Sequence, residues 1–262
     1  MPEAETINLG EVSLAFRRWG AGEPLLLVHG LGTNSQLWVN QVEAFGDQFD
    51  VIAVDLRGFG LSDKPTQSGC YSIEKFSSDL LQLVSKLGIR KFHYLGTSMG
   101  GFIGQTMALR EPDRIRTLML IHTAARMSIP QDILDARLKA LKELPMTNYA
   151  EMVADQALAD GRQSKVFDWL SAMIAANDRA AYARVLSEGL SGFDLSNESA
   201  QLKMPVLVVV GDRDRVIPPA GGRALANAIP GATLQTLEHS GHIGYAEQPA
   251  VFNRIVLSFL GH

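Results

Sequence analysis

The stretch Gly96-Thr97-Ser98-Met99-Gly100-Gly101 follows the apolar run 92–95 and precedes the helix-like segment 102–109. A sharp turn between a strand and a helix holds a serine in a strained backbone conformation, and flanking glycines avoid collisions with the neighbouring strand and helix. This arrangement is typical of a nucleophile elbow, in which the hydroxyl of Ser98 stands clear of the sheet. The Gly-x-Ser-x-Gly pattern is weak by itself, because Gly and Ser are common in ordinary loops, so the rest of the chain has to support it.

Short apolar runs alternate with helix-like segments along most of the chain. The runs are residues 25–28, 51–54, 92–95, 117–121, 206–210 and 233–237. Continuous apolar runs predict strands covered on both faces, and helices between them predict a mainly parallel sheet. Residues 7–16, with apolar residues roughly alternating around Gly10, predict an antiparallel hairpin at the sheet edge. The predicted fold class is therefore α/β, a mostly parallel twisted sheet flanked by helices.

The strand pattern stops between residue 125 and about residue 197, where only helix-like segments occur. These segments are residues 131–143, 148–159, 164–175 and 179–190. We predict that residues 126–197 form a helical cap, or lid, inserted between core strands, and that residues 1–125 and 198–262 form the α/β core. Because open parallel sheets bind ligands at the carboxyl ends of their strands, a cap there would enclose the site.

Ser98 needs partners, because a serine hydroxyl is a poor nucleophile at neutral pH. An imidazole has to take its proton, and a carboxylate has to orient that imidazole. In a fold that carries a nucleophile elbow, the three residues are expected along the chain in the order Ser, acid, His. Each of them should lie just beyond the carboxyl end of a strand.

Two acids and two histidines stand in the expected places. Asp212 and Asp214 follow the strand 206–210, and we favour Asp214 because a few loop residues are needed to carry the carboxylate toward the histidine. His239 and His242 follow the strand 233–237, and we favour His242 because its loop gives it more freedom to reach Ser98. The alternative roles are an Asx turn for either aspartate and a loop position for His239.

Acyl transfer also requires hydrogen-bond donors for the negative charge that develops on the carbonyl oxygen, and backbone amides commonly supply them. One should be the amide of Met99, directly after the serine, and the other the amide of Leu31, in the loop after the strand 25–28. His29 lies in the same loop, where bracing of the loop is the more common role than catalysis.

The composition excludes several kinds of partner. The formal net charge is −4 and the chain has no run of Lys or Arg, so nucleic-acid binding is not expected. The apolar stretches are far shorter than the roughly 20 residues that span a bilayer, so no membrane partner is expected. The single cysteine, Cys70, and the absence of a signal-peptide pattern favour a cytoplasmic location. Without a metal-ligand spacing or a nucleotide fingerprint, no cofactor or metal is expected, and the oligomeric state stays open.

Five segments together resemble the α/β-hydrolase superfamily along nearly the whole chain. They are residues 29–32 (His-Gly-Leu-Gly), 55–62 (Asp-Leu-Arg-Gly-Phe-Gly-Leu-Ser), the elbow at Ser98, 211–214 (Gly-Asp-Arg-Asp), and Gly241-His242 followed by Glu247-Gln248-Pro249. The resemblance implies that residues 55–62 shape the floor of the site and stabilise loops. Ser98 stands where haloalkane dehalogenases and most epoxide hydrolases of this fold have an aspartate nucleophile.

Within the superfamily the chain is similar to the enol-lactonase-like hydrolases typified by 3-oxoadipate enol-lactonase, through residues 31–33, 98–105 and 123–126. It departs from them at His29-Gly30, where that family often has Ser-Asn, and in the loop before His242. The substrate of that family carries two carboxylates, which implies a basic cap. Residues 126–197 hold eight Lys or Arg against ten Asp or Glu, so the predicted cap is not basic overall.

Five large side chains of the predicted cap either face the substrate or pack between the cap helices, the second role being the more common. They are Met127, Met146, Phe167, Trp169 and Met173. A generally apolar cap suits a small or medium uncharged acyl group.

The ordered Ser98, Asp214 and His242 predict a serine hydrolase that cleaves a carboxylic ester or lactone of a small to medium substrate through an acyl-enzyme intermediate. The same groups also serve carbon-carbon bond hydrolysis, perhydrolysis or the enol-lactonase reaction itself. A receptor that keeps the three residues and binds a small ligand is a hypothesis from another class. It predicts tight binding with very slow turnover.

Overall fold

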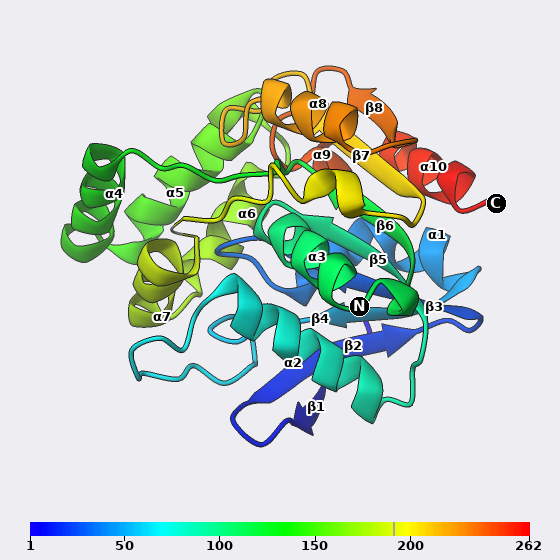
Figure 1. Cartoon of the computed structure of the whole chain (residues 1–262). Coiled ribbons are helices and arrows are strands. Elements are labelled where there is room, and N and C mark those ends of the chain that lie inside the picture. The colour runs from blue at the N-terminus through cyan, green and yellow to red at the C-terminus, as the bar shows by residue number, and fades with distance from the viewer. Residues whose placement is uncertain (191) are drawn as a thin grey trace.

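The computed structural model describes residues 1–190 and 192–262, which fold around one eight-stranded sheet (Figure 1). The strands are β1 (Glu5–Asn8), β2 (Ser13–Trp19), β3 (Glu23–Val28), β4 (Phe49–Val54), β5 (Phe92–Thr97), β6 (Ile115–Ile121), β7 (Val206–Gly211) and β8 (Thr233–Leu237). Their order is β1-β2-β4-β3-β5-β6-β7-β8. The β1-β2 and β2-β4 pairs are antiparallel and the other pairs are parallel. The predicted α/β class, with an antiparallel hairpin at the sheet edge, is confirmed.

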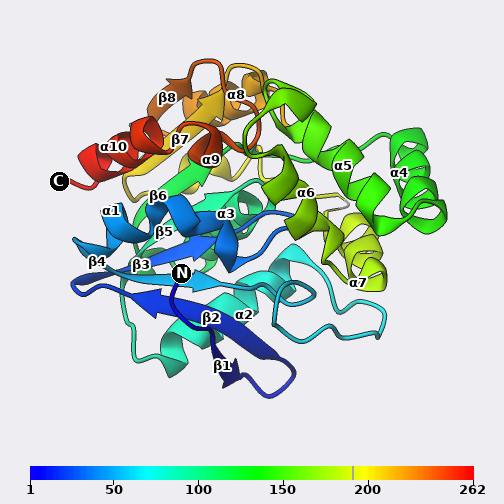
Figure 2. The same ribbon diagram turned by 180° about the vertical axis from the view of Figure 1, so that it is seen from behind.

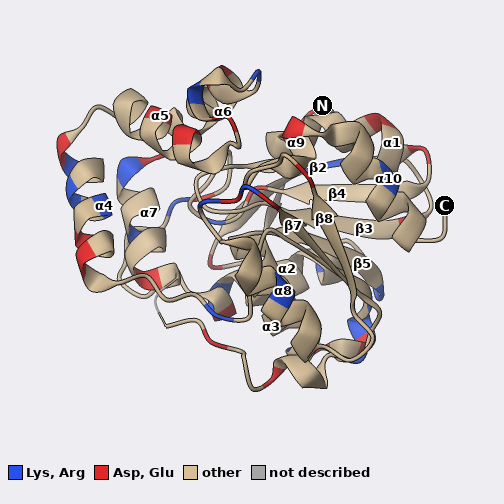
Figure 3. Cartoon of the chain, turned by 90° about the horizontal axis from the view of Figure 1, so that it is seen from above, with Lys and Arg blue, Asp and Glu red and all other residues tan. Residues whose placement is uncertain are grey.

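Helices cover both faces of the sheet, which explains why its strands are continuous apolar runs. The helices of this layer system are α1 (Val42–Gly46), α2 (Ile73–Lys86), α3 (Met99–Arg110), α8 (Pro219–Ala228), α9 (Gly244–Glu247) and α10 (Pro249–Phe259). Viewed from above, α1, α9 and α10 lie on one side of the sheet and α2, α3 and α8 on the other (Figure 3). Figure 2 shows the side of α1 and α10. None of the helices in the described ranges combines the length and the apolar composition of a membrane span.

The strand register brings the predicted site segments together. Val28 pairs with Gly96, so the loop after β3 lies beside the turn after β5. Gly211 pairs with Leu237, so the loops after β7 and β8 also begin side by side. Because these strands are parallel, all four loops leave the same edge of the sheet.

Between β6 and β7 the chain leaves the sheet and forms four helices. These helices lie over the edge of the sheet from which the site loops emerge (Figures 1 and 2). We refer to these helices as the cap: α4 (Gln131–Glu143), α5 (Met146–Ala157), α6 (Phe167–Ala175) and α7 (Arg179–Arg184). The bounds of α4 agree with the sequence-based expectation. Helix α5 begins two residues earlier than expected, directly after Pro145, and α6 begins later because residues 161–163 form a separate 3-10 turn. Helix α7 is shorter, since the chain continues as a π-helical turn over Val185–Gly189.

A short antiparallel neck joins the cap to the core. Arg126 and Asp194 form an isolated bridge. On either side of it, the Met127 N–H donates to the Phe193 carbonyl and the Leu195 N–H donates to the Ala125 carbonyl, each at 2.8 Å. The cap therefore leaves and re-enters the core at the same point.

Candidate active site

The turn after β5 holds Ser98 in a strained conformation. Its φ is +54° and its ψ is −117°, a region that residues with side chains rarely adopt. A Cβ atom at Gly96 would overlap the Gly100 carbonyl, and one at Gly100 would overlap the Val28 carbonyl, so both glycines are needed for the close approach of strand and helix. The Ser98 N–H donates to the Ile121 carbonyl at 2.9 Å, which fixes the turn against β6.

The residues of the two predicted oxyanion donors belong to the start of α3 and to the loop after β3. Met99 is the first residue of α3, and the first-turn amides of a helix have no acceptor within the helix. Leu31 belongs to the loop after β3 and, like Ser98, lines a cavity between core and cap. The helix dipole and the first-turn N–H groups of α3 favour negative charge at this point.

Asp214 is buried, and its two carboxylate oxygens have separate partners. Oδ1 accepts hydrogen bonds from the N–H groups of Val216 at 2.8 Å and Ile217 at 2.9 Å. Oδ2 accepts one from His242 Nδ1 at 2.7 Å. Burial favours a higher pKa for Asp214, but the charge and hydrogen bond of His242 and the other polar neighbours outweigh burial and lower the pKa. The carboxylate is therefore ionised and fixes the His242 proton on Nδ1, which leaves Nε2 as the basic nitrogen.

The loop of His242 is tied to the cap by backbone hydrogen bonds. The His242 N–H donates to the carbonyl of Ala157, the last residue of α5, at 2.7 Å. The Glu247 carboxylate accepts from the Gly241 N–H at 2.7 Å and from the Ala159 N–H at 2.8 Å. Core loop and cap thus share the bonds that position the imidazole.

The competing acid and histidine lie elsewhere. Asp212 is exposed and accepts a hydrogen bond from the Ser240 N–H at 3.1 Å, which is a loop-stabilising contact. His239 is exposed and its Nδ1 lies 2.6 Å from Arg213. The structure thus brings together Asp214 and His242, and not the other two.

His29 and Asp55 stabilise loops near the cavity. His29 Nδ1 lies 2.7 Å from the Gly30 carbonyl, and Nε2 accepts a hydrogen bond from the Leu56 N–H at 2.9 Å. Burial lowers the pKa of His29 to about 4, so the ring is neutral near pH 7. Asp55 accepts from the N–H groups of Ser35 at 2.7 Å and Leu61 at 2.9 Å. These contacts are structural.

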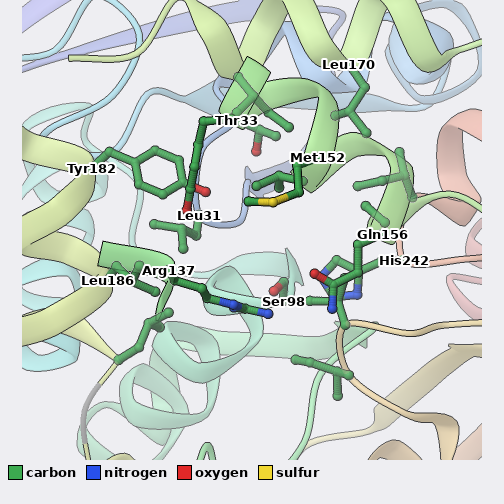
Figure 4. A pocket seen from close by; sticks show the side chains of 18 of the residues that line it. Leu31, Thr33, Ser98, Arg137, Met152, Gln156, Leu170, Tyr182, Leu186 and His242 are labelled. Atoms are coloured by element: carbon green, nitrogen blue, oxygen red, sulfur yellow. The ribbon is translucent and has the colours of Figure 1, made fainter. Parts of the chain in front are cut away.

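A cavity of about 290 Å³ separates the core loops from the cap. Ser98 and His242 lie on its core side, and Figure 4 shows Arg137 and Met152 entering it from the cap. The apolar part of the lining includes Leu31, Phe102, Leu170, Ile174, Leu186 and Ile217.

Among the five cap side chains considered from the sequence, Met127 lines the cavity. Phe167 and Met173 are buried within the cap, and Met146 and Trp169 are partly buried against the apolar core, none of the four in the lining. An apolar periodicity shows that one face of a helix is shielded from solvent. That face can either pack on neighbouring helices or line a cavity. Phe167 and Met173 are covered by protein, and Met146 and Trp169 are covered in part.

Several polar residues of the site were not identified from the sequence. Arg137 on α4 is the one Lys or Arg among the described lining residues, which include no Asp or Glu. Tyr149 and Tyr182 also line the cavity, with ring centroids 5.6 Å apart. His122 lies directly after β6, a position that follows the strand-end rule used for the other residues. Within the described chain, no group of three or more His, Cys, Asp or Glu is placed to hold a metal ion.

Comparison with known proteins defines the family. The pattern of the family described as alpha/beta hydrolase fold matches residues 23–167 and 171–249. The 3-oxoadipate enol-lactonase 2 of Acinetobacter baylyi is 32% identical over 257 residues, which cover 96% of this chain and 94% of that protein. The chain belongs to the α/β-hydrolase fold family, and its relatives support hydrolase activity.

Solved structures agree with this assignment. The enol-lactonase from Burkholderia xenovorans superposes with a TM-score of 0.91 at 31% identity, covering 98% of this chain and 100% of that one. A thermophilic esterase from Thermogutta terrifontis superposes with a TM-score of 0.89 at 28% identity, covering 98% of both chains.

Proposed function

We propose that the protein is a serine hydrolase that cleaves a carboxylic ester or lactone through an acyl-enzyme intermediate. The observation that carries the proposal is the buried hydrogen bond of 2.7 Å between Asp214 Oδ2 and His242 Nδ1, beside a cavity that both His242 and the strained Ser98 line. The similarity to enol-lactonases and to an esterase supports the same bond type.

In the proposed mechanism, Ser98 Oγ attacks the carbonyl carbon while His242 Nε2 takes the hydroxyl proton. The Leu31 and Met99 amides stabilise the negative charge on the carbonyl oxygen. His242 then gives the proton to the departing alkoxide or enolate oxygen, which leaves an acyl group on Ser98. A water molecule, deprotonated by His242, releases the acid and restores the serine. In a lactone, acid and leaving oxygen belong to one molecule.

We also propose that the substrate carries a negative charge, as an alternative to the uncharged acyl group expected from the sequence. Arg137 points into the cavity toward the side on which Ser98 lies (Figure 4). The cap arginines Arg162 and Arg184 pair with Glu151 and Glu188, but no residue that the structure describes forms such a pair with Arg137. Arg137 is a partly buried residue that lines the cavity, and a substrate carboxylate would give its guanidinium charge-assisted hydrogen bonds.

The first test compares the natural protein with Ser98→Ala on p-nitrophenyl esters and a panel of lactones. The proposal expects multiple turnover in the natural protein and its loss in the variant, with unchanged folding. A single acylation without turnover would instead favour a ligand receptor, and full activity of Ser98→Ala would exclude Ser98 as the nucleophile.

The charge preference is tested with a matched pair, the p-nitrophenyl monoester of succinate and p-nitrophenyl butyrate. Arg137→Met should raise KM for the anionic ester by about 10- to 100-fold, with little change for the neutral one. Arg162→Met is the control, because Arg162 belongs to the cap but does not line the cavity. Equal effects of Arg137→Met on both esters would contradict a role in charge recognition.

A further inference from the structure

His122 is a buried histidine next to the proposed acid. It follows β6 and has no solvent-exposed side-chain surface. Its Nδ1 lies 3.6 Å from Asp214 Oδ2, the same oxygen that accepts the hydrogen bond of His242. Its ring centroid is 5.8 Å from that of His242 and 6.1 Å from that of Tyr245. Asp214, His242 and Tyr245 are thus the titratable groups that face it, from the loops after β7 and β8 and from α9.

The fold keeps His122 at two energetic costs. Its φ is +47°, a conformation that is unfavourable for a residue with a side chain. Neither ring nitrogen has a hydrogen-bond partner among the described residues. The buried His29 and His93, in contrast, have partners for both nitrogens. Strain and unsatisfied polar atoms that persist beside reacting groups point to a functional role.

The Asp214 carboxylate is an acceptor close to a ring nitrogen of His122, with Oδ2 3.6 Å from Nδ1. An ionised carboxylate only accepts, so the proton of a neutral His122 ring belongs on Nδ1. The Nδ1 to Oδ2 distance is just beyond hydrogen-bond range, and such bonds are often long in ligand-free sites and shorten when substrate binds.

We infer that His122 is a positioning residue, whose Nδ1–H steadies Asp214 Oδ2 as His242 receives the Ser98 proton. This inference rests on the proposed serine-hydrolase function. Burial lowers the pKa of His122 to about 4, so it stays neutral while His242 becomes charged. One carboxylate then faces one cation and one neutral donor, which avoids placing two positive rings beside each other.

The test compares His122→Phe, which removes the donor, with His122→Asn, whose amide nitrogen can take the place of Nδ1. Two rates are measured between pH 5 and 9: ester hydrolysis and the labelling of Ser98 by a fluorophosphonate. His122→Phe should lower kcat and the labelling rate by roughly 10-fold without changing KM, and its acidic limb should move to higher pH. His122→Asn should stay within about threefold of the natural rates.

Stability separates positioning from packing. His122→Phe should unfold at the same temperature as the natural protein or higher, because it removes unsatisfied polar atoms. His93→Phe, at the other end of β5 from Ser98, is the control: it should lower stability and leave kcat unchanged, since His93 bonds to Glu23 and Thr117. The inference is overturned if His122→Phe keeps the natural kcat, or if His122→Asn loses as much rate as His122→Phe.

A spectroscopic readout separates failure of this inference from failure of the proposed function. In ¹⁵N-histidine-labelled protein, the ring proton of His122 should be on Nδ1 at neutral pH, and its resonance should move upfield in Asp214→Ala. A proton on Nε2 alone would overturn the positioning role even if the protein is an active esterase. If the proton is on Nδ1 but fluorophosphonates do not label Ser98, the proposed function is contradicted. The contact between His122 and Asp214 would still stand.

Discussion

The two sides of the cavity are built in different ways. On the core side, backbone hydrogen bonds hold Ser98 and Asp214 in loops that leave parallel strands, and His242 is held by the backbone carbonyl of Ala157 at the end of α5. On the cap side, the lining consists of side chains that project from helix surfaces, and Ile133 and Met152 remain 45% and 43% exposed. From this difference we expect backbone geometry to set the proposed chemistry and individual side chains on α4 and α5 to set which molecule is accepted.

The largest effect should come from the core side. Asp214→Asn places an amide N–H group against His242 Nδ1, which favours the wrong tautomer and should lower kcat by about 10⁴-fold. Steady-state kinetics of ester hydrolysis measure the loss. Asp212→Asn is the matched control and should change kcat by less than about threefold, because Asp212 is exposed and the amide oxygen of Asn can still accept the hydrogen bond from the Ser240 N–H. Similar losses in both variants would mean that the acid is misassigned.

A stability test compares ion pairs in the two regions. Arg57 and Asp79 form a buried pair in the core, with N to O distances of 2.5 and 2.6 Å. Arg57→Met leaves a buried carboxylate alone and should lower the free energy of unfolding by about 3–5 kcal/mol. The exposed cap pair of Arg162 and Glu151 should contribute at most about 1 kcal/mol, as tested by Arg162→Met. Urea unfolding followed by circular dichroism measures both, and a larger loss from the cap variant would reverse the comparison.

Lowering the pH should reduce the stability of the core before that of the cap. Burial lowers the pKa of His29 and His122 from 6.5 to about 4, so the unfolded chain binds more protons between these values. The contribution of these histidines to the free energy of unfolding is therefore fully present above about pH 6.5. It should fall as the pH drops toward 4, by roughly 2 kcal/mol per histidine at pH 5. Urea midpoints at pH 7 and pH 5 measure the loss, and His122→Phe should remove part of it. Residues 126–197 contain no histidine, so unchanged stability between these pH values would disprove the burial argument.

The smallest effect should come from the rim of the cap. Met152 lines the cavity and is partly exposed, so Met152→Ala should enlarge the site with less than about 1 kcal/mol of destabilisation. The ratio of kcat/KM for hexanoyl and acetyl p-nitrophenyl esters should rise by about two- to fivefold. Met146 lies on the same helix outside the lining, so Met146→Ala should leave this ratio unchanged. The reverse pattern would mean that the cavity is lined differently in solution.

The core could be predicted from the sequence because hydrogen-bonded strands constrain the residues directly after them. Once the strands are placed, a serine between glycines and polar residues beyond the strand ends have few possible positions, as with Ser98, Asp214 and His242. His122 obeys the same rule, but a single histidine between Ile121 and Thr123 carries no spacing pattern that marks it.

The cap could be predicted only as helices. The alternation of apolar and charged residues in α4 places Arg137 among other exposed charges, and nothing local distinguishes a cation that enters a cavity from one in solvent. In the same way, Met127 and Met173 have similar sequence surroundings, yet one lines the cavity and the other packs between helices. Such distinctions depend on how helices pack, which tertiary contacts decide.

The neck at Arg126 and Asp194 makes the cap an exchangeable module. The segment between them is already a loop closed by its own backbone pairing, so a replacement of different length would enter and leave the core at the same two residues. The entropy of loop closure grows only slowly with length, so the joint itself tolerates such a replacement. The new segment would also have to supply an acceptor in place of the Ala157 carbonyl, which binds the His242 N–H. Recombination at this joint is therefore expected to alter substrate choice in one step, with Ser98, Asp214 and β1 to β8 inherited unchanged and only the cap contacts of the His242 loop to be rebuilt.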